Sequence, residues 1–161
     1  VMPHSSESFA ISADDAMFLQ MMIPHHQQAI EMATMAATQS ESKKIRILAR
    51  GIKEVQSLEV TKMKSWLSRA GYPTSDPGMG MGVDGMLTED QMAGLRAAQG
   101  SAFDDLFLAG MIQHHQGAIT MAQDEVDNGT NKKVQVMAAA VIATQTAEVA
   151  AMKAMQAVGN N

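Results

Sequence analysis

The chain has 161 residues, among them 16 methionines, 5 histidines and no cysteine, and it carries a formal net charge of -5. This length fits one domain with a hydrophobic core. A hydrophobic content of 46% with 18% charged residues excludes an intrinsically disordered chain. The absence of cysteine excludes a disulfide scaffold, a thiolate metal site and a thiol nucleophile. The acidic balance argues against nucleic acid as a partner.

Membrane insertion is not expected from the distribution of apolar residues. The longest purely apolar run, residues 136–143, has eight residues, whereas a helix that spans a bilayer needs about 20. We therefore predict no transmembrane span. No signal segment is visible at the beginning of this sequence, so we expect any export signal to be absent from this chain.

The first half of the chain reads as a helical hairpin over residues 14–70. Apolar side chains recur at three- and four-residue spacing through residues 14–39 and 43–70, which predicts two long helices joined by a polar turn. We expect Ser12 to cap the first helix and Gly71 to end the second.

A connector and a second hairpin follow. Residues 71–100 form a connector rich in methionine and glycine, with a short helix expected after Thr88. This connector is long enough to run the length of a helix, so it permits a crossover between the hairpins. Residues 101–158 repeat the hairpin pattern, with the turn at Asn128 and Gly129. We take residues 1–161 as a single domain.

The two hairpins are copies of each other at a constant offset of 89 residues, without a gap. The pairs that are identical include Asp15 and Asp104, Met22 and Met111, His25 and His114, His26 and His115, Gln56 and Gln145, Glu59 and Glu148, and Met63 and Met152. Four long helices without a convincing strand predict an all-α four-helix bundle built from two duplicated hairpins.

Several polar residues fall on the apolar faces of these helices. His26 lies near the centre of the apolar arc of its helix and His25 near its edge, while Gln56 and Glu59 lie within the arc of the next helix. Counting from the turn, we expect His26 to face Gln56 and Met22 to lie close to Glu59. The offset places His115 with Gln145 and Met111 with Glu148 in the second hairpin.

Two interpretations of these inward polar groups are open. A hydrogen-bonded network of His, Glu and Gln would fix the register of the helices. Alternatively, the duplicated set holds a metal ion, because burial without partners costs several kcal/mol per group. Imidazole, carboxylate and thioether ligands together suit copper, and the thioethers favour Cu(I) or its surrogate Ag(I) over zinc or iron.

Further methionines lie outside this set. Met21 shares an outer flank of the first helix with Met17 and Met35, which indicates an interface or a ligand stripe. Additional candidate ligands of lower rank are Met2, His4, Met21, Met79, Met81 and Met86. Gly110 and Gly117, seven residues apart, share one helix face and would let the connector or a second subunit approach closely.

The motif Met-Ile-(Pro/Gln)-His-His-Gln-x-Ala-Ile-x-Met-Ala, followed by Gln-x-x-Glu-x-x-x-Met, occurs twice and resembles the domain-of-unknown-function family DUF305. The resemblance covers residues 14–156. It implies a ferritin-like four-helix bundle, exported or lipid-anchored in bacteria, often associated with copper resistance and with at least one periplasmic copper-binding member. Carried over by position, the motif residues that it implies for metal binding are His25, His26, His114, His115, Met22, Met111, Met63, Met152, Glu59 and Glu148.

From these observations we expect a non-enzymatic, extracytoplasmic protein that sequesters or relays copper. The alternative is a structural or interaction bundle whose polar network only stabilises the fold. A redox enzyme with a metal in the bundle is disfavoured, because the Glu-x-x-His motif of di-iron bundles is missing. The expected partner is a metal ion, and a copper-handling protein and a second copy of the chain are further candidates.

Overall fold

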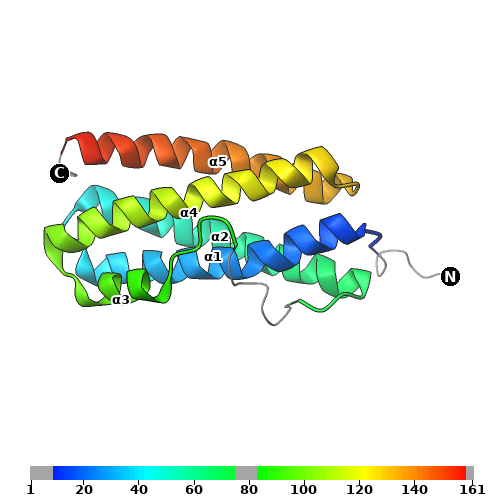
Figure 1. The fold of residues 1–161 in the computed structure, drawn as a ribbon, viewed down its shortest axis with the longest axis horizontal. Helices are drawn as coiled ribbons and strands as arrows, with labels where there is room; N and C mark the ends of the chain where they lie inside the picture. Colours follow the sequence, from blue (N-terminus) through cyan, green and yellow to red (C-terminus); the bar gives the residue numbers. More distant parts are fainter. Residues whose placement is uncertain (1–8, 75–82, 159–161) are drawn as a thin grey trace.

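The computed structural model describes residues 9–74 and 83–158, and the regular structure in these ranges is entirely helical. Four long helices lie alongside one another, and a short fifth helix lies within the connector (Figure 1). In chain order they are α1 (Ala13–Gln39), α2 (Lys43–Ala70), α3 (Glu89–Ala97), α4 (Gly100–Asn128) and α5 (Lys132–Ala157). The described part of the chain is therefore an all-α bundle, and the long helices lie where the sequence predicted them.

Local sequence signals set the ends of the helices. Ser12 and Asp15 form a capping box in which the Ser12 hydroxyl accepts from the Asp15 N–H at 3.1 Å and the Asp15 carboxylate accepts from the Ser12 N–H at 2.9 Å. Thr88 and Gln91 form the same motif at the start of α3. Gly71 ends α2 with a φ of 83°, a left-handed conformation that favours glycine.

The two hairpins pack through α1 and α4, which run antiparallel. Near the start of α1, Asp15 accepts a hydrogen bond from the N–H of Thr130 beyond the end of α4, at 3.0 Å. At the other end of α1, Gln39 donates to the carbonyls of Leu95 and Ala98, ahead of α4, at 2.7 and 2.8 Å. Helices α2 and α4 therefore run in the same direction, and the connector returns along the bundle (Figure 1). The crossover that the sequence permitted is the one that the chain adopts.

Two hydrophobic clusters fill the two ends of the bundle. The first contains Met22 of α1 and Met63 of α2, and the second contains Met111 of α4 and Met152 of α5. All four methionines are fully buried. Between the clusters lies a set of polar residues that we call the polar belt: His25, His26, Gln56, Glu59, His114, His115, Gln145 and Glu148.

Glycines on α4 let the connector approach closely. A Cβ added at Gly117 would collide with the carbonyl group of Asp84, and one added at Gly110 would come within 3.0 Å of the Leu87 side chain. Gly85 has a φ of 78° and lies directly against the backbone at Gly117. The connector, rather than a second subunit, thus uses the glycine face predicted from the sequence.

Helix α5 is, by length and composition alone, apolar enough to cross a membrane. Its longest purely apolar run, residues 136–143, nevertheless has only eight residues. Only 28% of its most apolar window is buried in the bundle. The same test is passed by core helices of soluble proteins, and the buried residues of α5, such as Val134 and Val141, belong to the first hydrophobic cluster. This observation is therefore weak evidence for a membrane span.

Candidate metal centre

Each hairpin contributes one buried histidine that is hydrogen-bonded to a glutamate. Nε2 of His26 on α1 donates to Oε1 of Glu59 on α2 at 2.6 Å. In the second hairpin, Nε2 of His115 on α4 donates to Oε1 of Glu148 on α5 at 2.7 Å. The histidine side chains are buried, whereas the glutamate side chains are 16% and 19% exposed. The duplication in the sequence is therefore a duplication of contacts.

These contacts correct one expectation. Counting from the turn predicted that His26 faces Gln56, but its hydrogen-bond partner is Glu59, one helical turn farther along α2. Every Cα–Cβ bond tilts toward the N-terminus of its own helix, so side chains in an antiparallel pair lean in opposite directions. His26 leans away from the turn and Glu59 leans toward it, and their ends meet. The same shift replaces Gln145 by Glu148 as the partner of His115.

The other two histidines meet each other between α1 and α4. The rings of His25 and His114 lie with their centroids 3.8 Å apart at an interplanar angle of 38°. Both residues are buried, His25 completely and His114 to within 1%. Nε2 of His25 donates to the carbonyl oxygen of Asp84 in the connector at 2.7 Å. His25, which the sequence placed near the edge of the apolar arc, is thus as enclosed as His26.

Burial keeps these two rings uncharged. Burial, together with the nearby His26 and His115, lowers the pKa of His25 to about 4. Burial also holds the pKa of His114 well below its usual value, and the neighbouring histidines act in the same direction. A neutral imidazole has one nitrogen with a free lone pair, which is the form that binds a metal ion.

The polar belt contains several buried atoms without a partner among the described residues. Nδ1 is unpartnered in all four histidines, and Nε2 of His114 is unpartnered as well. Because Nε2 of His25, His26 and His115 donates to an oxygen, Nδ1 of a neutral ring carries the lone pair. The side-chain oxygens of Gln56 and Gln145 are also unpartnered. Such atoms fit a site that takes up a ligand, since buried polar groups normally have partners.

The two half-sites converge where α2 faces α5. A narrow cavity of about 10 Å³, about the size of one water molecule, is lined by Gln56 and Glu59 from α2 and by Gln145 and Glu148 from α5. Among the described residues, no three His, Asp or Glu side chains converge closely enough to hold a metal ion. A metal site here therefore needs thioether sulfur, and the four fully buried methionines flank the belt on both sides.

The lower-ranked ligands predicted from the sequence have separate locations. Met21 and Met86 are partly buried and pack at the edge of the first hydrophobic cluster, away from the second. Met2, His4, Met79 and Met81 lie outside the residues that the structure describes.

Sequence reasoning missed the contribution of the connector to this centre. Asp84 binds His25 through its backbone carbonyl, so its side chain gives no signal in the sequence. Gln28 fixes the next part of the connector, accepting from the N–H of Leu87 at 2.8 Å and donating to its carbonyl at 3.1 Å. The small residues Gly85 and Gly117 were the available signal, because they mark where two backbones touch.

Comparison with known proteins gives one family and a consistent group of structures. The family model DUF305, described as a domain of unknown function, matches residues 15–156. No curated protein matches the chain.

Three solved structures are similar over nearly their whole length. A Streptomyces coelicolor protein described as "putative secreted protein DUF305" is 31% identical, with a TM-score of 0.85, over 92% of this chain and 94% of that one. A DUF305 fragment from Deinococcus radiodurans is 29% identical, with a TM-score of 0.83, over 90% and 96%. CopM in its Cu(I)-bound form is 32% identical, with a TM-score of 0.72, over 88% and 95%. Structures of CopM with Ag and with Cu(II) are also similar.

Proposed function

This chain belongs to the DUF305 family. On that premise we propose that it is a non-enzymatic, extracytoplasmic protein that binds copper, mainly as Cu(I), for sequestration or relay. The relative CopM binds Cu(I), Cu(II) and Ag. The Streptomyces relative is described as secreted. A chain that offers thioether and imidazole ligands without cysteine suits an oxidising compartment, where thiols would be lost.

The observation that supports the proposal most strongly is the state of the histidine rings. Nδ1 of each ring in the polar belt is buried and unpartnered, while Nε2 of His26 and His115 is held by a glutamate. Metal-binding histidines commonly donate their second N–H to a carboxylate, which fixes the tautomer and the ring orientation. Glu59 and Glu148 would accordingly position the rings, and Nδ1 would face the metal.

The methionines would supply the remaining ligands. Met22 and Met63 lie one helical turn from His26 and Glu59, in the first hydrophobic cluster. Met111 and Met152 have the corresponding positions in the second cluster. Thioether sulfur selects Cu(I) and Ag(I) over harder ions, and a His/Met set keeps Cu(I) bound without thiolate. The bound ion is cargo in this proposal, and no chemical step follows its binding.

A second candidate function is a purely structural bundle. The His–Glu hydrogen bonds of 2.6 and 2.7 Å favour it, because they are complete without a metal ion. In this view the polar belt fixes the register of the helices, and the unpartnered nitrogens are a cost that the fold tolerates.

Competition for Cu(I) separates the two candidates. The apoprotein is titrated with Cu(I) against a chromophoric chelator, and a variant with Met22→Leu and Met111→Leu is compared with the wild type. Leucine keeps the volume and removes the sulfur, so the fold is retained. We expect the variant to bind at least about tenfold more weakly. Met92→Leu, at a buried position in α3, is the matched control and should bind like the wild type.

Other results would count against the proposal. If the wild-type protein fails to compete with the chelator, the copper proposal fails. If Met79→Leu, Met81→Leu and Met86→Leu together abolish binding while the core variant binds normally, the metal belongs to the connector. Ag(I) added to ¹⁵N-labelled protein gives an independent readout, because the Nδ1 resonances of the bound histidines should shift and their Nε2 resonances should shift less.

A further inference from the structure

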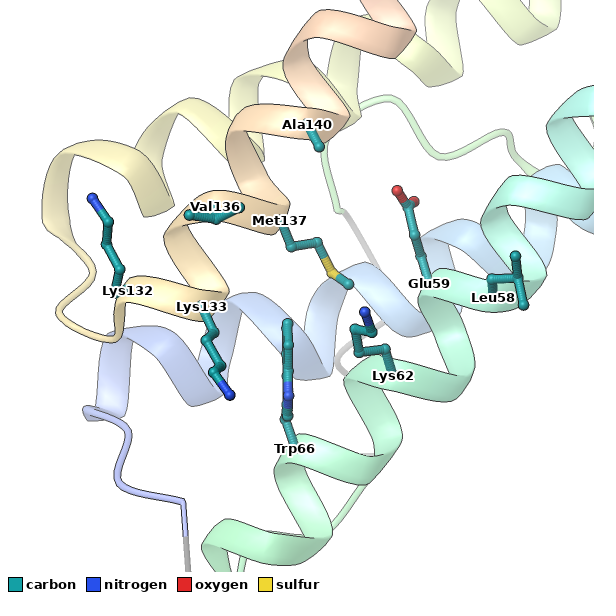
Figure 2. Close-up of a pocket in the computed structure, with 9 residues that line it drawn as sticks. All are labelled: Leu58, Glu59, Lys62, Trp66, Lys132, Lys133, Val136, Met137 and Ala140. Carbon is teal, nitrogen blue, oxygen red and sulfur yellow. The ribbon is translucent and has the colours of Figure 1, made fainter. Parts of the chain in front are cut away.

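A second concave site opens where α2 and α5 diverge, beside the polar belt. It has a volume of about 590 Å³, within the range of small-molecule pockets. Its walls come from Leu58, Glu59, Lys62 and Trp66 of α2 and from Lys132, Lys133, Val136, Met137 and Ala140 of α5. In Figure 2 the side chains of Lys62, Trp66, Lys133 and Met137 point toward one another across the gap. We call this concavity the α2/α5 pocket.

The charged side chains that line the α2/α5 pocket are three lysines and one glutamate, so its charge is positive on balance. Lys62, Lys132 and Lys133 form no ion pair with any residue that the structure describes, although the whole chain carries a net charge of -5. Glu59 is the only carboxylate in the lining, and its Oε1 is already bound by His26. An anion that entered this pocket would therefore meet unpaired ammonium groups.

The N-terminus of α5 adds to this field. Lys132 and Lys133 are the first two residues of α5, and no acidic residue occupies its first turn. Cations at a helix N-terminus are electrostatically unfavourable, because the helix dipole already places positive charge there. A bound anion would relieve this repulsion and interact with the dipole at the same time.

Apolar surface makes up most of the pocket wall. Trp66 has one face covered by the Phe9 ring, whose centroid lies 5.5 Å away at an interplanar angle of 9°. Val136 and Leu58 are 56% and 73% exposed, respectively. Because large exposed apolar side chains at a concavity favour an apolar occupant, the ligand needs a hydrocarbon part in addition to its charge.

Two of the residues that line the α2/α5 pocket, Lys62 and Trp66, are not repeated in the second hairpin. At the offset of 89 residues, Lys62 corresponds to Ala151 and Trp66 to Met155. The combination of ammonium group and indole is therefore present in one half of the bundle only. We propose that the α2/α5 pocket binds a small anionic amphiphile, with its carboxylate on Lys62 and Lys133 and its chain on Trp66, Val136 and Met137.

The occupant is a free molecule and not a membrane lipid. Lys62 and Lys133 line a concavity between two helices (Figure 2), whereas proteins that lie on a bilayer typically present their cations and apolar side chains along one amphipathic helix. Glu59 belongs to both this pocket and the polar belt. Lys62 and Lys133 are not among the proposed copper ligands, so substituting them tests this proposal separately from copper binding.

Trp66 is the only tryptophan of the chain and reports directly on occupancy. Decanoate, below its micelle concentration, is titrated into the apoprotein while Trp66 emission and, separately, calorimetric heat are followed. We expect a saturable change in both signals. The variant Lys62→Glu with Lys133→Glu should bind at least about tenfold more weakly.

A matched variant controls for net charge. Lys44 corresponds to Lys133 in the other hairpin, and Lys64 is an exposed residue of α2 that does not line the pocket. Lys44→Glu with Lys64→Glu makes the same change in charge and should bind decanoate within about twofold of the wild type. Decanol, which keeps the chain without the charge, should bind more weakly than decanoate.

Three results would overturn the proposal. One is the absence of a saturable signal with decanoate. A second is equal weakening in the two charge-reversal variants, which would indicate a general effect of net charge. The third is a response to vesicles of anionic phospholipid without any response to free decanoate, which would make the pocket a membrane-binding face.

Discussion

The ring of His25 lies against the ring of His114, with 3.8 Å between their centroids, where α1 crosses α4 at the middle of the bundle. The two residues correspond at the offset of 89, so each hairpin presents the same side chain to the other. Their surroundings nevertheless differ. The carbonyl of Asp84 accepts from Nε2 of His25, whereas both ring nitrogens of His114 are unpartnered among the described residues. Because the connector accepts a hydrogen bond from His25 and not from His114, two residues that correspond in the duplication differ in their hydrogen bonds.

This inequality predicts opposite effects of the same substitution. His114→Leu removes two unpartnered buried nitrogens, and the apoprotein should become more stable by about 1 kcal/mol. His25→Leu leaves the Asp84 carbonyl without its donor and should destabilise the apoprotein by about 1–3 kcal/mol. Urea denaturation of both variants measures the difference. Equal losses of stability would mean that the contact with the connector contributes nothing.

The close approach of the connector to α4 depends on Gly117. Gly117→Ala would drive a methyl group into the carbonyl of Asp84, so the connector has to shift and the protein should lose about 1–3 kcal/mol of stability. Gly51→Ala is the matched control, because a Cβ at this position in α2 meets no atom within 4 Å. There the substitution should stabilise the helix by about 0.5–1 kcal/mol. Thermal unfolding of the two variants should show shifts in opposite directions.

Asp15 and Glu125 form a carboxyl pair at one end of the bundle. Burial, together with the neighbouring Asp15, raises the pKa of Glu125 to about 9. Burial acts in the same direction on Asp15, but the adjacent Glu125 carboxyl and the N–H groups of Ser12, Thr130 and Asn131 outweigh it and lower the pKa of Asp15 to about 2. At neutral pH Glu125 is therefore protonated and Asp15 ionised.

The pair predicts a dependence of stability on pH. The raised pKa of Glu125 gives a contribution that is complete below its unfolded value of 4.5 and is lost as the pH rises toward about 9. Glu125→Gln keeps the residue uncharged, so it should be more stable than the wild type by about 1–2 kcal/mol at pH 8 and equal to it at pH 4. Urea denaturation at pH 4, 6 and 8 measures this difference. Glu54→Gln, at an exposed position, should show no such trend.

The duplicated His–Glu hydrogen bonds allow the same experiment twice in one protein. Double-mutant cycles with His26→Leu and Glu59→Gln, and with His115→Leu and Glu148→Gln, should each give a coupling energy of about 1–3 kcal/mol. Since the two distances are 2.6 and 2.7 Å, the two energies should agree within about 0.5 kcal/mol. A coupling near zero in either cycle would show that the contact does not contribute to stability.

Much of the fold could be predicted from local sequence. Helix ends depend on residues close in the chain, and the predicted cap at Ser12 and the predicted end at Gly71 are both confirmed. The duplication at an offset of 89 residues predicted that His26 and His115 have equivalent surroundings, and their contacts with Glu59 and Glu148 confirm it.

The tertiary structure decided which side chains meet. Residue counting paired His26 with Gln56, and the tilt of side chains toward the N-terminus of each helix moved the contact to Glu59. The meeting of His25 with His114 depends on how the hairpins dock, and the capture of His25 by Asp84 depends on where the connector returns. Spacing along one helix determines which face a residue occupies, whereas contacts between helices are set by packing. The sequence alone therefore predicted the candidate ligands, and the tertiary structure decided their geometry.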